Sequence, residues 1–113
     1  MLTACQQSHQ QQENSPAVNI PVYEFNGISA SARLTGRLTL KNGCLYADDS
    51  LLIFPENQVK WDELSQTLTY KGRSYQVGQQ VDFSGGNGDF KQNSDRIKHL
   101  NQQCIEKYVW FVG

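Results

Sequence analysis

The chain has 113 residues with 10 Lys or Arg against 11 Asp or Glu, and its formal net charge is −1 at pH 7. This length corresponds to one compact domain, and the charge balance excludes the strongly basic face that double-stranded nucleic acid requires of a partner. The longest apolar runs, residues 51–54 and 108–112, are far shorter than the roughly 20 residues of a transmembrane helix, so no helical span is predicted.

The N-terminal segment changes character abruptly at Cys5, after which it is rich in Gln, Ser and Asn. The tetrapeptide Leu2-Thr3-Ala4-Cys5 resembles a bacterial lipobox, in which the cysteine is acylated and becomes N-terminal after cleavage. The resemblance implies a membrane anchor on Cys5, and Gln6 in place of Asp implies sorting to the outer membrane of a Gram-negative cell. A signal peptide also needs basic and apolar regions upstream, so we expect that Met1 is not the native start.

Residues 6–19 carry too little apolar surface to offset the entropy lost on ordering, which predicts a flexible tether. The alternative is that Cys5 is an ordinary residue of a disordered N-terminus. We therefore expect residues 1–20 to comprise a lipobox remnant and a Gln-rich tether, and residues 21–113 to form one disulfide-linked β-domain.

Period-two alternation over residues 32–41 predicts a strand with one buried face. Asn42-Gly43 tolerates positive φ and is followed by an apolar segment, which is the sequence signature of a tight hairpin. Further short apolar segments, each bounded by turn residues, cover residues 51–54, 59–62, 66–70, 75–77 and 81–83.

Ser84-Gly85-Gly86-Asn87-Gly88-Asp89-Phe90 is interpreted as a loop that ends the last of these strands. It resembles the glycine-aspartate repeats that bind calcium, but it is a single copy with altered spacing, so no calcium site is predicted. Residues 93–103 are the one helical candidate, with Ser94 as N-cap and Ile97 and Leu100 three apart. Residues 108–112 are predicted to form a central or closing strand that pairs with the first long strand.

This series of short segments predicts an all-β domain with at most one short helix. The architecture is either a small antiparallel barrel, OB-like or similar, or a two-layer sandwich.

The three cysteines are Cys5, Cys44 and Cys104. If Cys5 carries lipid, the oxidising compartment of an exported protein favours a bridge between Cys44 and Cys104. Two buried free thiols and a reactive thiol remain as alternatives.

One set of residues in the predicted β-domain resembles a pattern found in small domains of exported bacterial proteins, a group without a named activity. The residues that carry the resemblance are Gly43, Cys44, Leu45, Phe54, Pro55, Val77, Gly78, Val81, Gly85, Gly86, Cys104, Val109 and Trp110.

Two groups of side chains are candidate binding residues. Arg33, Arg37 and Lys41 share one face of the first long strand and form a cationic row suited to anionic lipid headgroups or peptidoglycan carboxylates, unless they are only its solvated side. An aromatic platform for sugars or single-stranded nucleic acid is a further hypothesis, although alternation predicts that most of its members are core residues. They are Trp61, Trp110, Tyr46, Tyr70 and Tyr75, of which charged neighbours make Trp61 the best candidate.

No pattern of residues predicts catalysis. Asp48-Asp49 and Asp62-Glu63 are adjacent carboxylates of the kind found in turns, whereas acid–base pairs converge across a cleft. His9 and His99 lack a nucleophile to activate, and the scattered Cys and His residues do not match a zinc site. We expect no enzyme activity, no metal and no cofactor.

These observations predict a lipoprotein of the outer membrane, facing the periplasm or the cell surface, whose domain is a non-catalytic binding or assembly module. Its expected partners are the membrane, through Cys5, and an envelope protein or peptidoglycan. The alternatives are an inhibitor of a host or envelope enzyme, similar to lysozyme inhibitors, a barrel that binds saccharides or oligonucleotides, and an enzyme or carrier that uses the barrel mouth.

Overall fold

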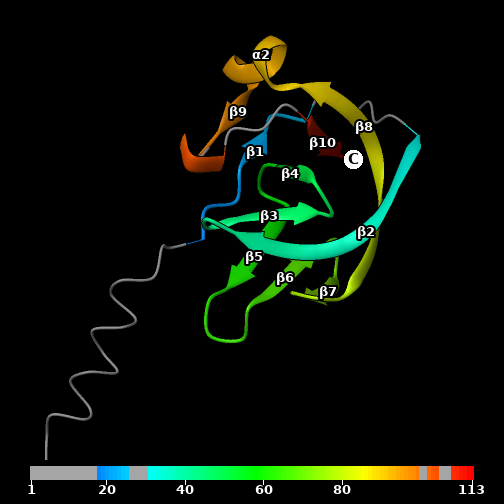
Figure 1. Cartoon of the computed structure of the whole chain (residues 1–113), viewed down its shortest axis with the longest axis vertical. Coiled ribbons are helices and arrows are strands. Elements are labelled where there is room, and N and C mark those ends of the chain that lie inside the picture. The colour runs from blue at the N-terminus through cyan, green and yellow to red at the C-terminus, as the bar shows by residue number, and fades with distance from the viewer. Residues whose placement is uncertain (1–17, 26–30, 100–101, 105–107) are drawn as a thin grey trace, which may run out of the picture.

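The structure is a computed structural model that describes residues 18–25, 31–99, 102–104 and 108–113 (Figure 1). Residues 1–17, which include the predicted lipobox remnant with Cys5 and most of the predicted tether, lie outside the described residues. The longest helix within the described part of the chain has four residues, so none of those helices has the length to cross a bilayer.

Five strands form a closed barrel: β2 (Ala32–Lys41), β3 (Cys44–Ala47), β4 (Ser50–Pro55), β8 (Gln80–Asp89) and β10 (Tyr108–Val112). Strands β2, β3 and β4 are consecutive antiparallel neighbours, and β8 returns to pair with β2, which is the Greek-key order. β10 closes the barrel between β8, to which it is antiparallel, and β4, to which it is parallel. The all-β, OB-like prediction is confirmed, because a five-stranded Greek-key barrel is the architecture of that fold.

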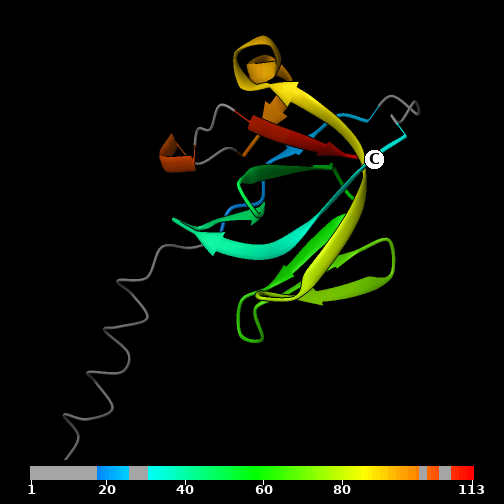
Figure 2. The same ribbon diagram turned by 45° about the vertical axis from the view of Figure 1, so that its right-hand side comes forward.

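A separate three-stranded antiparallel sheet is inserted between β4 and β8. It consists of β5 (Val59–Asp62), β6 (Thr67–Tyr70) and β7 (Arg73–Gln76), in that order. Figure 2 shows it below the barrel, with β8 running up from it along the barrel wall. Alternate residues of β6, Leu68 and Tyr70, are buried against the barrel, which leaves the opposite face of this sheet polar.

The buried residues divide into two clusters, and β4 contributes to both because neighbouring residues of a strand point to opposite faces. We call the cluster inside the barrel the barrel core; its fully buried members are Leu38, Leu45, Ala47, Leu52, Phe54, Leu68 and Val112. We call the cluster on the outside of β3, β4 and β10 the outer core; it comprises Tyr23, Cys44, Tyr46, Leu51, Ile53, Ile97, Cys104 and Val109.

Short segments from both ends of the domain cover the outer core. β1 (Val22–Tyr23) pairs in parallel with the end of β4 and antiparallel with β9 (Ile97–Lys98). The connection from β8 to β10 contains α2 (Phe90–Asn93), η1 (Ser94–Arg96), β9 and η2 (Gln102–Cys104). The Tyr23 hydroxyl donates to the Val112 carbonyl oxygen at 2.7 Å, which ties this layer to the last barrel strand.

The helix predicted over residues 93–103 is formed only in part, as short helical turns interrupted by a strand. The part of that segment which the structure describes contains η1, β9 and η2. Ile97 is paired with Tyr23 across β9 and β1 and is buried in the outer core, and His99 follows with a positive φ of 62°. A tertiary strand partner therefore replaces the weak local helical preference.

The loop predicted around Gly85-Gly86-Asn87-Gly88 is also wrong, because these residues lie inside β8 and pair with β10. A Cβ on Gly85 would overlap the carbonyl oxygen of Phe111, and a Cβ on Gly88 would overlap the Phe111 ring. Gly85 also has φ of 142°, which disfavours any other residue. The glycines are required by the close approach of two strands.

β10 is a closing strand as predicted, but the prediction that it pairs with the first long strand is wrong. Both edges of β2 are already occupied, by β3 and by β8. β10 therefore pairs with β8 and β4 instead.

Candidate functional site

The outer face of β3 and β4 corresponds to the face with which OB-fold barrels bind oligonucleotides and oligosaccharides, together with the flanking loops. In this protein Cys44, Tyr46, Leu51 and Ile53 on that face are at most 1% exposed. They are covered by β1, β9 and Cys104 within the outer core. The usual ligand surface of such barrels is therefore occupied by the chain itself.

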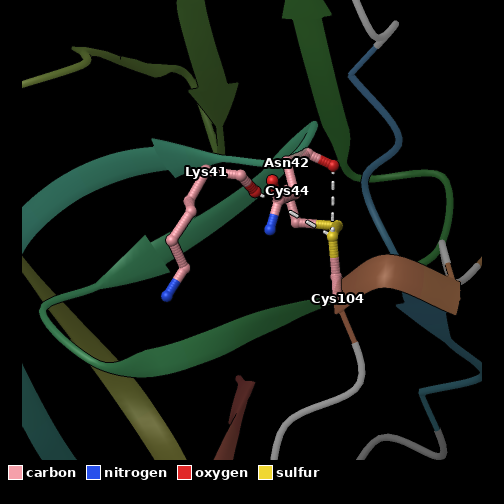
Figure 3. Close-up of a disulfide and its surroundings, with 4 residues drawn as sticks. All are labelled: Lys41, Asn42, Cys44 and Cys104. Carbon is pink, nitrogen blue, oxygen red and sulfur yellow. Dashed lines mark hydrogen bonds between the residues drawn. A yellow bond between two sulfur atoms is a disulfide. The ribbon is translucent and has the colours of Figure 1, made fainter.

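A disulfide between Cys44 and Cys104 holds this cover in place (Figure 3). The two Cα atoms are 6.3 Å apart, within the range of protein disulfides. The Cys104 sulfur lies 3.4 Å from the carbonyl oxygen of Asn42, a contact and not a hydrogen bond, since a disulfide sulfur has no proton to donate. The predicted bridge is confirmed, and it links the first residue of β3 to the segment that precedes β10.

The three cations of the predicted row are exposed on β2, but each is already engaged. Arg33 donates to both carboxylate oxygens of Asp82, at 3.1 and 2.9 Å. Arg37 donates to the Gly78 carbonyl oxygen at 2.6 Å, and the Lys41 ammonium lies 4.7 Å from the centre of the Tyr46 ring.

The structure separates these three side chains into two surface hollows. Arg37 and Lys41 line an open depression of about 540 Å³ together with Thr39, Tyr46, Asp48 and Asp49. Its two cations are balanced by two carboxylates, so it has no preference for one sign of charge. Arg33 lines a different hollow, beside the β6–β7 hairpin.

The aromatic residues of the predicted platform do not form one. Tyr46, Tyr70 and Trp110 are 1%, 5% and 3% exposed, which agrees with the interpretation of most of these residues as core. Trp61 is partly exposed as predicted and packs against the barrel core, and its buried indole N–H has no hydrogen-bond partner among the described residues.

The second hollow, of about 270 Å³, lies between the β6–β7 hairpin and the β2–β8 pair, and we call it the hairpin hollow. Its lining residues are Arg33, Tyr70, Lys71, Arg73, Tyr75, Asp82, Phe83, Ser84 and Gly113. The hairpin turn is Lys71-Gly72, with positive φ values of 53° and 78°, and it places Tyr70 directly opposite Arg73. The type I′ turn thus brings a tyrosine and two cations together at one end of the domain.

Tyr70 is the least satisfied polar group of this hollow. Its hydroxyl is buried and has no hydrogen-bond partner in the described part of the chain. Burial, assisted by Tyr23 and Tyr75, raises the pKa of Tyr70 to about 12, so the hydroxyl stays protonated and is a donor at neutral pH. An unpaired buried hydroxyl costs about 1–3 kcal/mol, which a ligand acceptor would recover.

Lys71 and Arg73 were not among the residues that the sequence singled out for binding. The signal that identifies them is the Lys71-Gly72 turn itself, since a two-residue hairpin fixes the pairing of its flanking residues. What the sequence does not contain is the position of β2 and β8, which supply Arg33 and Asp82 from the other side.

Asp48-Asp49 lies in a turn, as predicted, and Asp62-Glu63 spans the end of β5 and the start of the turn that follows. Asp48 has φ of 53° and accepts a hydrogen bond from the Arg37 backbone N–H at 2.9 Å, and Asp62 accepts from Leu64 N and Ser65 Oγ. Within the described ranges, no three His, Cys, Asp or Glu side chains are grouped closely enough to hold a metal ion.

Comparison of the chain with protein-family models, with curated proteins and with solved structures finds no match. The functional argument therefore depends on the residues and geometry described above.

Proposed function

We propose that this protein is an exported lipoprotein, anchored through Cys5 to the outer membrane, whose β-domain is a non-catalytic binding module of the cell envelope. The observation that carries the proposal is the Cys44–Cys104 bridge. Disulfides of this kind persist in oxidising compartments and are rare in the cytosol. Both cysteines of the bridge are 0% exposed, so we infer a structural role for it and not a redox-catalytic one.

The distribution of surfaces supports binding by a site other than the usual barrel face. The outer face of β3 and β4 is closed by the outer core, which removes the surface that oligonucleotide-binding barrels use. The hairpin hollow remains open and carries an excess of cations. This favours a small envelope ligand over a nucleic-acid strand.

The anchor is tested by expressing the complete gene in its own cell and feeding an alkyne-tagged fatty acid. We expect the wild-type protein to incorporate the tag and to sediment with outer membranes, and Cys5→Ser to do neither. The matched control is Cys44→Ser, which loses the bridge but retains Cys5. We expect this variant to incorporate the tag. An untagged, freely soluble wild-type protein would contradict the proposal.

The compartment is tested separately with a maleimide reagent added to intact cells before lysis. We expect Cys44 and Cys104 to react only after a reducing agent is added. Reaction of both cysteines without reduction would place the domain in a reducing compartment and overturn export.

A second candidate function is inhibition of a host or envelope enzyme, and one observation favours it. Leu64, at the tip of the β5–β6 hairpin, is 96% exposed, so this large apolar side chain is accessible to a pocket of a partner enzyme. An inhibitor of this kind would lower lysozyme activity on cell walls, and Leu64→Ser would abolish the effect. Equal enzyme activity with and without the wild-type protein would eliminate this candidate.

A further inference from the structure

The hairpin hollow has an electrostatic character unlike that of the chain as a whole. Its lining side chains include three cations, Arg33, Lys71 and Arg73, against one carboxylate, Asp82, which Arg33 engages. The whole chain has a formal net charge of −1. A local positive field of this kind raises the concentration of small anions at the hollow.

The donors of the hollow suit an oxyanion. Arginine has five N–H donors in a planar fork, of which Asp82 engages only those on Nε and one terminal nitrogen of Arg33. Arg73 and Lys71 are exposed on the hairpin, with the Lys71 ammonium 5.4 Å from the centre of the Tyr70 ring. Guanidinium and ammonium groups form their strongest hydrogen bonds with carboxylate and phosphate oxygens.

Tyr70 is the second, independent observation that points to a ligand. Its side chain lines the hollow but is only 5% exposed. Its hydroxyl has no hydrogen-bond partner among the residues that the structure describes. Because the hydroxyl oxygen is itself covered, a ligand must displace a neighbouring side chain to reach it. Lys71 is an exposed neighbour of Tyr70, with its ammonium over the Tyr70 ring, and its flexible side chain can move without loss of buried contacts.

The size of the hollow limits the ligand. Its volume of about 270 Å³ is below that of sites for drug-sized molecules, which begin near about 300 Å³. The rings of Tyr75 and Phe83, whose centres are 5.3 Å apart, supply apolar wall beside the cations. The hollow is therefore suited to a single charged group carried on a small ring or short chain.

We propose that the hairpin hollow binds the oxyanion, carboxylate or phosphate, of a small envelope ligand, with Arg73 and Lys71 as the charged contacts and the Tyr70 hydroxyl as the directed donor. This inference deepens the proposed binding role and names its ligand chemistry. It is tested on the purified full chain, so its outcome is independent of whether Cys5 is lipidated.

The first experiment follows backbone amide NMR signals while N-acetylmuramic acid, inorganic phosphate or N-acetylglucosamine is added at constant ionic strength. The first sugar differs from the last by a carboxylate-bearing group. We expect shifts of the residues that line the hollow with a Kd of about 1 mM for at least one of the two anions, and none for the neutral sugar. Tighter binding of the muramic acid would identify a carboxylated sugar as the source, and tighter binding of phosphate a phosphorylated ligand.

The second experiment repeats the titration with variants. Arg73→Gln should raise the Kd by about five- to tenfold, as expected for loss of one charge-assisted contact. Lys60→Gln, which removes an exposed cation from β5 of the same sheet but outside the hollow, should leave the Kd unchanged. Equal effects of both variants, or binding of neither anion to the wild type, would overturn the proposal.

Tyr70→Phe separates a binding role from a purely structural one. Removing an unpaired buried hydroxyl should raise the midpoint of thermal unfolding, by about 4 °C, while raising the Kd for the anion about fivefold. A variant that is less stable, or that binds the anion as well as the wild type, would show that the hydroxyl has no part in the site.

Discussion

The barrel core and the outer core contain residues of similar chemistry, yet they are assembled differently. The barrel core is lined by long strands, with two of ten residues each, β2 and β8, hydrogen-bonded along much of their length. The outer core is covered by strands of two residues, β1 and β9, and by a three-residue turn of helix. Backbone pairing therefore holds the first core, whereas the cover of the second has few hydrogen bonds of its own.

The difference explains where the disulfide lies. Cys44 and Cys104 are 60 residues apart in the sequence and both belong to the outer core. A covalent link there restrains the segment whose backbone pairing is weakest. The barrel core, closed by five paired strands, has no such link among its buried members.

The largest effect is expected at the closure of the barrel. Gly85→Ala places a Cβ into the Phe111 backbone and strains a residue at φ of 142°, so we expect a loss of about 4 kcal/mol or more in unfolding free energy. Gly72→Ala, which has φ of 78° but open space around the new Cβ, should lose only about 1 kcal/mol. Urea denaturation measures both. Equal losses would show that the close approach of β8 and β10 is not what requires Gly85.

Removal of the disulfide is expected to affect the two cores unequally. The double variant Cys44→Ala and Cys104→Ala should lose about 4 kcal/mol of stability for a loop of this length. Native-state hydrogen exchange should show the largest loss of protection in β1 and β9 and a smaller loss in β2 and β8. A uniform loss across all four strands would mean that the two cores unfold as one unit.

Leu51 and Leu52 provide a matched pair, since both are 0% exposed and they face opposite cores from neighbouring positions in β4. Each change to Ala should cost about 3 kcal/mol in the oxidised protein. In the double cysteine variant, Leu51→Ala should cost much less while Leu52→Ala keeps its full effect, because the outer core is then already loosened. Unchanged costs for both would contradict a disulfide-dependent outer core.

The smallest effect is expected at the exposed Arg33–Asp82 pair. The hydrogen bond from Arg33 lowers the pKa of Asp82 below its ordinary value of 3.8. A carboxylate with a lowered folded-state pKa adds stability above its unfolded pKa and loses it as the pH falls through the folded value. The urea midpoints of wild type and Asp82→Asn should therefore differ slightly at pH 6 and converge once the pH has fallen below the lowered folded-state pKa of Asp82. A difference that grows on acidification would contradict the assignment.

Local sequence patterns predicted the parts of the fold that depend on near neighbours. The Asn42-Gly43 turn and the alternation along β2 are both present in the structure, because turn chemistry and strand period act over a few residues. The pairing of Cys44 with Cys104 is confirmed, although the sequence predicts it only on the condition that Cys5 carries lipid. Arg33 was identified as a candidate, but its partners in the hairpin hollow were not.

The sequence alone thus determined the all-β class and the hairpins, and it favoured the bridge over two free thiols only if the protein is exported. Tertiary structure decided that Gly85 and Gly88 lie within a strand, that residues 97–98 pair with β1 instead of forming a helix, and that Tyr70 and Arg73 face Arg33. Each of these depends on a segment distant in the chain whose position no local pattern encodes. The physical reason is that the backbone hydrogen bonds of a turn or a helix are made between near neighbours in the sequence. Those of a strand are made with another strand, and which strand that is depends on how the barrel closes.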